Sequence, residues 1–455
     1  MQSNVGAVPR VRHRVIVKFW DDDAVSDYGR IAGSRDEPQA ALSRRLAERL
    51  PGVAVQRIFA SVPPTRIREL TAQAAARDTS YRAPDFLSYF RVDCPTDPHI
   101  VCENLKRWEA VQNAYVDAAA VGPAVGFRDS PLELHQGYLG PAPAGIDVEF
   151  ARQFRGGRGE GQDFVDLEEG WTLDHEAVAA HGATVLHGTI CDDHRPHGTA
   201  VLSEVCGVGD AAGSVGIAPK LRSVKVVSHH GSTRANAMLA AIDRLPLGGV
   251  LLVEAQLLGL TVRGKTWPPV PIETLDADFD VIRLATALGI TVVEAAGNGG
   301  TDLDTFENAN GRRVINRDDP EFRDSGAIVV GAARSTTAHT RLHSSNYGSR
   351  IDCYAWGEHV ATATSTFMAP FLTDAYTDSF SETSSAAPMI AGAALVLQGI
   401  TEAAQEGRRL GAREMRSILS NPATGTSSSN PAVDRIGVMP DLRRILEHRR
   451  PKASH

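Results

Sequence analysis

Two short segments, HGTA (197–200) and TSSAAP (383–388), each place a reactive side chain at the start of a predicted helix of small residues. A serine hydroxyl becomes a good nucleophile only when a base takes its proton, and the base in turn needs an orienting carboxylate. Ser384 is the candidate nucleophile and His197 the candidate base. Asp166 ends an apolar strand, where an unpaired carboxylate would be costly, so it is the candidate orienting group.

A reaction of this kind also needs hydrogen-bond donors for the negative charge that develops on the substrate. The helix after Ser384 offers backbone N–H groups, and Asn298, which closes VVEAAGN, offers a side-chain amide. The order Asp166, His197, Ser384, with spacings of 31 and 187 residues, is one of the known orders of a catalytic triad. Any one of these residues alone would be explained by a structural role, but together they predict a serine hydrolase.

From about residue 160 the sequence alternates short apolar strands with helices, which is typical of a parallel α/β sheet. The predicted strands are QDFVDLE (162–168), RSVKVVS (222–228), GGVLLVEAQ (248–256), ITVVEAAGN (290–298) and AIVVGAAR (327–334), and the predicted helices cover about 198–206, 235–245 and 279–288. Sites in such sheets lie at the carboxyl ends of strands. Asp166 and Asn298 are both at such ends.

The first part of the chain has a different pattern of elements. It contains a strand at 14–19, helices around 37–50 and 65–77, a strand at 85–93, a helix from about 95 to 110 and a strand at 111–118. We therefore divide the chain into a flexible N-terminus (1–13), a small α+β domain (14–118), a Gly/Pro-rich linker (119–145), a catalytic domain (146–445) and a C-terminal tail (446–455).

These motifs resemble those of the subtilase family of serine peptidases. The segment GEGQDFVDLEEGW with His175 downstream is similar to the family's aspartate segment, HGTA with VGIAP (215–219) to its histidine segment, AAGN to its oxyanion segment and TSSAAP to its serine segment. The resemblance covers roughly 146–445 and implies a subtilisin-like parallel sheet flanked by helices. It also implies the roles of orienting carboxylate for Asp166, general base for His197, oxyanion donor for Asn298 and nucleophile for Ser384.

The resemblance further implies which residues lie beside a peptide substrate. The strand before the oxyanion segment lines the cleft in this family, which assigns Glu254, Ala255, Gln256 and Gly297 to substrate binding. By position, the unit at 14–118 resembles the propeptide that many subtilases use as a folding chaperone and inhibitor, and an ordinary accessory domain is the alternative.

The sequence departs from the family pattern at two places. Leu167-Glu168 follow Asp166 where a small residue and a glycine are usual, and Glu382 begins the serine motif where a glycine is usual. If position 382 has a positive φ, a residue other than glycine costs about 1 kcal/mol or more. We expect the Glu382 carboxylate to point away from the site.

Composition excludes several other functions for the 455 residues. With a net charge of −8 and no basic run, nucleic acid is not an expected partner. The first twenty residues lack the apolar core of a secretory signal, and no stretch approaches the ~18 apolar residues of a membrane span. Five cysteines without a zinc spacing predict free thiols in a reducing compartment. We expect a protein made in the cytoplasm, with any export unconventional.

The function predicted from these residues is that of a serine endopeptidase that cleaves polypeptides through an acyl-enzyme. One alternative is a pseudoprotease, disabled by Glu382, that binds peptide or a partner protein; an esterase with the same triad is another. The N-terminal unit or a separate inhibitor is expected to restrain the activity. No cofactor or metal is predicted: solvated loop charges explain Asp192, Asp193 and His194 better than a metal site, and although calcium stabilises many subtilases, Asp302, Asp304, Asp318 and Asp319 form no recognisable calcium loop.

Overall fold

The computed structural model describes residues 14–20, 44, 48, 52–94, 97–121, 136–209, 214–366 and 368–449. The chain divides into two compact units. The first combines Met1–Ala60 with Pro84–Ala118, and the second combines Ser61–Ala83 with Ala119–His455. The segment Ser61–Ala83, which the sequence analysis included in the small N-terminal domain, therefore belongs to the larger unit. The helix predicted around 37–50 lies almost entirely outside the described residues.

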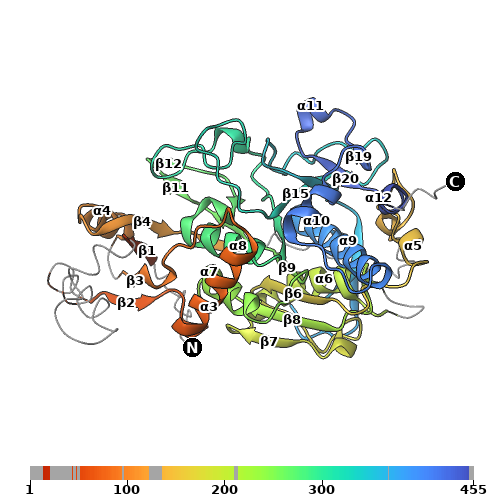
Figure 1. Ribbon diagram of the computed structural model, residues 1–455, viewed down its shortest axis with the longest axis horizontal. Coiled ribbons are helices and arrows are strands. Elements are labelled where there is room, and N and C mark those ends of the chain that lie inside the picture. Colours follow the sequence, from red (N-terminus) through yellow and green to blue (C-terminus); the bar gives the residue numbers. More distant parts are fainter. Residues whose placement is uncertain are drawn as a thin grey trace, which may run out of the picture. The chain divides into compact units, whose positions relative to one another are not determined.

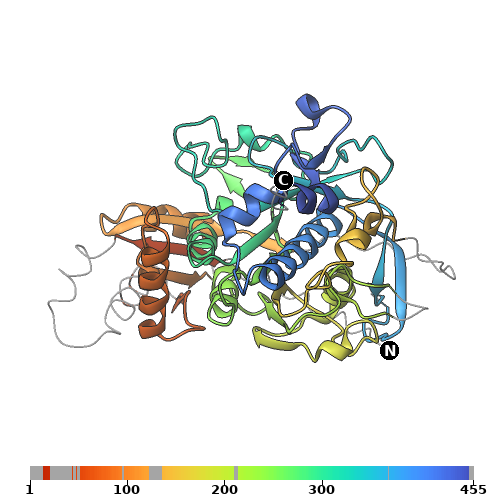
Figure 2. The same ribbon diagram turned by 45° about the vertical axis from the view of Figure 1, so that its right-hand side comes forward.

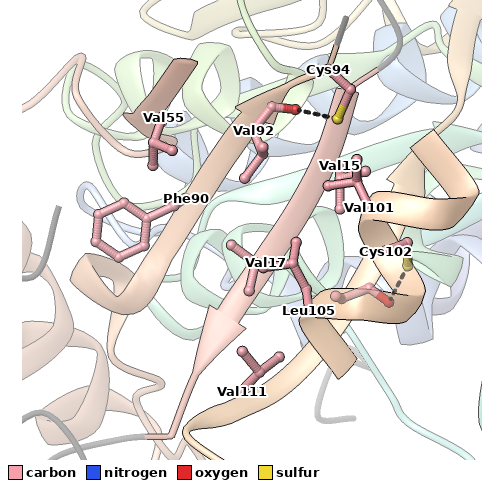
Figure 3. Close-up of a cluster of buried hydrophobic side chains, with 11 residues drawn as sticks. Val15, Val17, Val55, Phe90, Val92, Cys94, Val101, Cys102, Leu105 and Val111 are labelled. Carbon is pink, nitrogen blue, oxygen red and sulfur yellow. Dashed lines mark hydrogen bonds between the residues drawn. The ribbon is translucent and has the colours of Figure 1, made fainter. Parts of the chain in front are cut away.

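The first unit is a four-stranded antiparallel sheet with a helix packed on it. The strands, in the spatial order β2-β3-β1-β4, are β2 (Ala54–Arg57), β3 (Tyr89–Asp93), β1 (Arg14–Phe19) and β4 (Val111–Asp117), and the helix is α4 (Pro98–Lys106). Alternate residues of β1, such as Val15 and Val17, point into a core that α4 closes with Val101 and Leu105 (Figure 3). The thiol of Cys102 donates to the Ala114 carbonyl oxygen in this core, at 3.2 Å. The unit therefore has a hydrophobic core of its own.

The second unit is built on a nine-stranded sheet (Figure 1). Its spatial order is β19 (Gly425–Ser427), β20 (Val438–Pro440), β16 (Cys353–Trp356), β15 (Ile328–Ala333), β14 (Thr291–Ala295), β9 (Val250–Val253), β6 (Asp163–Glu168), β8 (Ser223–Ser228) and β7 (Thr184–His187). All neighbours pair in parallel except β19 with β20. Every residue of β9, β14 and β15 is buried, so both faces of the central sheet are covered, as parallel sheets require.

Helices of the second unit pack on this sheet and on one another. α9 (Thr383–Ala404) packs against α6 (Arg195–Cys206) and against β9, β14, β15 and β16 (Figure 2), whereas α7 (Arg234–Ile242) and α8 (Asp276–Ala287) pack together. α3 (Pro64–Arg77) packs against α8, and α10 (Ala412–Leu419) and α12 (Leu442–Arg449) complete the larger helices after α9. α9 is the one helix in the described part of the chain that is long and apolar enough to span a membrane, but its whole apolar stretch is buried inside the protein, as in a core helix.

Candidate active site

The strand order reverses at β6, which is where open α/β sheets bind ligands. From β6 the chain continues to β7 and β8 on one side, and then to β9 on the other side of β6. Glu168 is the last residue of β6, and Glu254 directly follows β9. The carboxyl ends of two neighbouring strands thus bring two carboxyl groups to one place.

The imidazole of His197 is held by Glu168, not by Asp166. His197 lies in the first turn of α6 and is only 3% exposed, and its Nδ1 is 2.7 Å from Glu168 Oε1. The ring also packs edge-on against Phe380, with 5.6 Å between centroids. The other ring nitrogen, Nε2, is buried and has no hydrogen-bond partner among the described residues. His197 therefore has the arrangement of a general base: one nitrogen fixed by a carboxylate and the other available.

Asp166 makes a different contact from the one the sequence predicted. Its Oδ2 accepts a hydrogen bond from Trp171 Nε1 at 2.8 Å, and Trp171 is completely buried. Asp166 and Glu168 are two residues apart on one strand and so share a face of the sheet, but only Glu168 is at the strand end beside α6. A β-carbon on Gly198 would lie 2.2 Å from the Gly170 carbonyl oxygen and 2.8 Å from the Trp171 ring. The absence of a side chain at Gly198 lets α6 approach this close.

Burial shifts the pKa values of both His197 and Glu168. It lowers the pKa of His197 to about 3, because a charged ring would lose its hydration and would lie near His194. It also raises the pKa of Glu168 well above its usual range, and His194 opposes that shift. His194 forms an ion pair of its own with Glu169, whose carboxylate lies 2.9 Å from His194 Nε2. Within this pair, His194 favours the ionised form of Glu168 and Glu169 disfavours it.

Asn298 contacts Thr383, the residue before Ser384, at the start of α9. Ser384 is the second residue of the helix and is 2% exposed. The Asn298 side-chain oxygen accepts from the backbone N–H and the hydroxyl of Thr383, at 3.1 and 2.7 Å. This fixes the amide, and its Nδ2 group is left buried without a hydrogen-bond partner among the described residues. A fixed donor without a partner, one residue from a serine hydroxyl, is the arrangement that stabilises an oxyanion.

Glu382 precedes this helix in a backbone conformation that glycine normally occupies. Its φ is 72° and its ψ is −163°, so the positive φ considered in the sequence analysis is present. Its backbone N–H donates to the Gly357 carbonyl oxygen at 2.7 Å, and its carboxylate accepts from the Ser344 hydroxyl. Ser344 therefore holds the carboxylate, and the strain lies in the backbone.

The family model of the subtilases matches residues 174–438, more than half of the chain. The chain belongs to the subtilase family. Subtilisin-like protease 1 of Pseudogymnoascus destructans is 28% identical over 252 residues, 54% of each chain. Subtilisin DY of Bacillus licheniformis is 28% identical over 251 residues, 54% of this chain and 78% of that protein. A structure of proteases from Pseudoalteromonas arctica has a TM-score of 0.49 at 20% identity, covering 69% of this chain and 96% of that one. The chain spans about half the length of the first two curated relatives it matches.

The predicted subtilisin-like parallel sheet flanked by helices is confirmed by the observed sheet, by the helices packed on it and by the family match. The four residues predicted to bind substrate differ in their contacts and burial. The Gln256 side chain accepts from the Asn298 backbone N–H at 2.8 Å, so it holds the loop that carries Asn298. The side chains of Ala255 and Glu254 are buried, at 1% and 2% exposure. Gly297 has a φ of 91°, and a β-carbon there would lie 2.9 Å from Asn346 Nδ2.

Both edges of the short strand that begins at Gln256 are occupied by strands of the same chain. β10 (Gln256–Leu258) pairs on one side with β13 (Val270–Pro271) and on the other side with β5 (Ala119–Val121), both antiparallel. Gln256 is opposite Val121 and Leu258 is opposite Ala119, so β5 runs toward the end of β10 that adjoins Glu254. The residues after Val121, up to 135, lie outside the described part of the chain.

Several contributors to the site escaped sequence reasoning. Glu168 was visible only as a departure from the family pattern, and Thr383 was read only as part of the serine motif. Three of the aspartates considered for metals bind arginines: Asp192 pairs with Arg195, and Asp302 and Asp304 pair with Arg435. Within the described ranges, no group of three or more His, Cys, Asp or Glu side chains is arranged to hold a metal ion.

Proposed function

We propose that this subtilase is a serine endopeptidase that uses Glu168, His197 and Ser384 as its triad and Asn298 as an oxyanion donor. His197 Nε2 takes the Ser384 hydroxyl proton while Oγ forms a bond to the substrate carbonyl carbon. The carbonyl π electrons move to the oxygen, which Asn298 Nδ2 stabilises. The oxyanion then re-forms the carbonyl as the C–N bond breaks, and the imidazolium protonates the leaving amine. Water hydrolyses the resulting acyl-enzyme by the same route, and Ser384 regains its proton.

One observation carries this proposal: the Asn298 amide is fixed by Thr383 with its Nδ2 lacking a partner among the described residues. Such a buried donor costs free energy unless something uses it. A tetrahedral oxyanion on Ser384 would use it. The Glu168–His197 contact of 2.7 Å supports the same chemistry by holding the base.

We infer that the substrate is a polypeptide that adds an antiparallel strand to β10. The pairing of β5 with β10 supports this, because extended peptides bind to sheet edges through main-chain hydrogen bonds. The same pairing means that β5 competes with substrate. β5 would therefore restrain the activity until it leaves the edge of β10.

The triad proposal is tested with a fluorophosphonate probe, which labels activated serines. We expect Ser384→Ala to abolish both labelling and peptide cleavage. Ser385→Ala is the matched control: its hydroxyl is one residue away but donates to the carbonyl oxygens of Trp356 and Glu382, both at 3.0 Å. That control should retain labelling. Undiminished peptide hydrolysis by Ser384→Ala would exclude Ser384 as the nucleophile.

The proposed restraint is tested by weakening the β5 pairing. Ala120 is opposite Leu257, and Ala120→Pro removes a backbone N–H that a strand can use. We expect this variant to cleave a short peptide faster than wild type, whereas Ala120→Ser, which keeps the N–H, should behave as wild type. Equal rates for all three would argue that β5 does not limit access.

A further inference from the structure

The loop 365–374 presents apolar side chains to solvent. Six large hydrophobic side chains are exposed among the described residues, and three of them lie in this loop. Met368 is 96% exposed, Phe371 62% and Leu372 39%, and the sequence has no charged residue from 360 to 373. We call Met368, Phe371 and Leu372 the apolar patch. Exposed apolar side chains gathered in this way mark a site of interaction.

The two strands that carry this loop lie beside His197. They are β17 (Val360–Thr364) and β18 (Ala375–Phe380), which pair with each other, and β17 packs against α6. The Thr364 hydroxyl donates to the Pro196 carbonyl oxygen at 3.2 Å, and Phe380 contacts the His197 ring. At about 3.3 Å per residue, β18 spans roughly 17 Å. An extended substrate would therefore need about five residues to reach from His197 to the apolar patch.

Specific contacts hold the loop in place. The Pro370 carbonyl oxygen accepts from the Thr172 hydroxyl at 2.7 Å. The Arg195 guanidinium lies over the Phe371 ring, 4.7 Å from its centroid, and Arg195 is two residues before His197. The apolar patch is thus formed before any partner binds and is anchored to the helix that carries His197. A preformed surface loses little conformational entropy on binding.

We propose that the apolar patch binds apolar side chains of the polypeptide substrate, several residues from the cleaved bond, and so determines specificity. This inference rests on the proposed function. The peptidase family makes a polypeptide the expected partner, and the patch is continuous with the site through Arg195 and β18.

The size of the apolar patch favours a peptide over a second copy of the chain. Its three side chains offer on the order of a few hundred Å². A stable protein–protein interface buries about 1,600 Å² in total. The apolar patch therefore fits a few residues of an extended peptide.

The charges around the apolar patch favour a peptide over a membrane. Segments that lie on membranes carry Lys and Arg beside their apolar side chains. The first charged residue after the patch is Asp374. Arg195, the cation in contact with Phe371, is already paired with Asp192 at 2.7 Å.

The experiment compares kcat/KM for a short peptide of about four residues with that for a peptide extending about six residues on both sides of the cleaved bond. The long peptide carries either leucine or serine at its outer positions. Phe371→Ser in the full chain should lower kcat/KM about tenfold for the leucine peptide, mainly by raising KM, because apolar contact is lost. The short and serine peptides should stay within about twofold of wild type.

Val433→Ser is the matched control, because Val433 of α11 (Pro431–Asp434) is 61% exposed and lies in the same unit. It should cleave all three peptides as wild type does. Met368→Ser is the second test variant and should change kcat/KM in the same direction as Phe371→Ser. Circular dichroism checks that each variant folds.

Binding without cleavage separates this inference from the proposed function. The Ser384→Ala chain should bind the leucine peptide, and adding Phe371→Ser should raise its Kd about tenfold. If wild type cleaved no peptide but this difference in Kd remained, the proposed function would fail and the patch assignment would stand.

Three results would overturn the inference. The first is an equal kcat/KM for the leucine peptide in wild type, Phe371→Ser and Met368→Ser. The second is an equal loss for the leucine and serine peptides. The third is unchanged peptide selectivity in Phe371→Ser together with loss of self-association in gel filtration, or of binding to phosphatidylcholine vesicles, which would assign the apolar patch to a second copy or to a membrane.

Discussion

Replacing Glu168 by glutamine tests which of two carboxyl groups orients the catalytic histidine. The change is nearly isosteric, but glutamine cannot carry a negative charge, and its amide can present a donor to Nδ1. His197 would then hold its proton on Nε2, the nitrogen that must accept from Ser384. In the proposed triad Glu168 has this role, because its Oε1 is 2.7 Å from His197 Nδ1.

The expected fall in kcat follows from the contact between Glu168 and His197. Both side chains are almost fully buried, at 2% for Glu168 and 4% for His197, so solvent screens the pair little. Burial disfavours the charge on Glu168, but a proton on His197 in the transition state favours it. At an effective dielectric constant of about 20, two such unit charges about 4 Å apart interact by about 4 kcal/mol. That stabilisation of the imidazolium is worth about 10³ in rate. The unfavourable histidine tautomer in Glu168→Gln would lower the rate further. In other triads, loss of the carboxylate lowers kcat about 10⁴-fold. We therefore expect kcat to fall 10³- to 10⁴-fold.

The assay is steady-state hydrolysis of a peptide, with Asp166→Asn as the matched comparison. Asparagine at 166 can still accept from Trp171 Nε1, and burial already favours an uncharged group there by raising the pKa of Asp166 well above its usual range. We expect kcat to change less than about tenfold. A loss of about 10³ in Asp166→Asn with near-normal activity in Glu168→Gln would refute this reasoning and restore Asp166 as the orienting residue.

Three other outcomes are expected. Asn298→Ala should lower kcat about 10²- to 10³-fold at unchanged KM in peptide hydrolysis, because the transition state loses its oxyanion donor. Glu382→Gly should change kcat/KM less than about tenfold, since Ser344 already holds the carboxylate; a gain of several orders of magnitude would favour the pseudoprotease alternative. Glu204→Gln should raise Tm more at alkaline than at acidic pH, because both Glu204 oxygens are buried without partners in the described structure and burial raises the pKa of this carboxyl well above its usual range. Scanning calorimetry of wild type and Glu204→Gln at several pH values tests this prediction. The same Tm difference between them at every pH would contradict it.

The central sheet could be predicted because its signals are local. The apolar runs at 162–168, 248–256, 290–298 and 327–334 correspond to β6, to β9 with β10, to β14 and to β15. Such runs are long and continuous because both faces of a parallel sheet are covered. His197, Asn298 and Ser384 were candidates for a similar reason: His197 and Ser384 lie in the first turns of α6 and α9, and Asn298 follows β14.

The partner of His197 could not be predicted in this way. Asp166 and Glu168 occupy alternate positions of one strand, and a period of two places both on the same face. The choice between them depends on where the strand ends relative to α6 and on the Trp171 indole, which binds Asp166. Those are tertiary contacts, and a motif read residue by residue does not contain them. The pairing of β5 with β10 escaped for a similar reason, because it joins residues more than 130 positions apart in the chain.

Carboxyl burial links the folding of this subtilase to its chemistry. Asp166, Glu168, Glu204 and Glu254 all have raised pKa values. A group whose folded pKa exceeds its unfolded value contributes stability that is complete below the unfolded pKa and is lost as pH rises through the folded one. For each such group the loss is about 1.4 kcal/mol per pH unit between the two values. His197 acts in the opposite direction, because its lowered pKa makes stability fall as pH drops below 6.5. Alkaline pH therefore ionises these buried acids and weakens the fold, while acidic pH weakens it through His197.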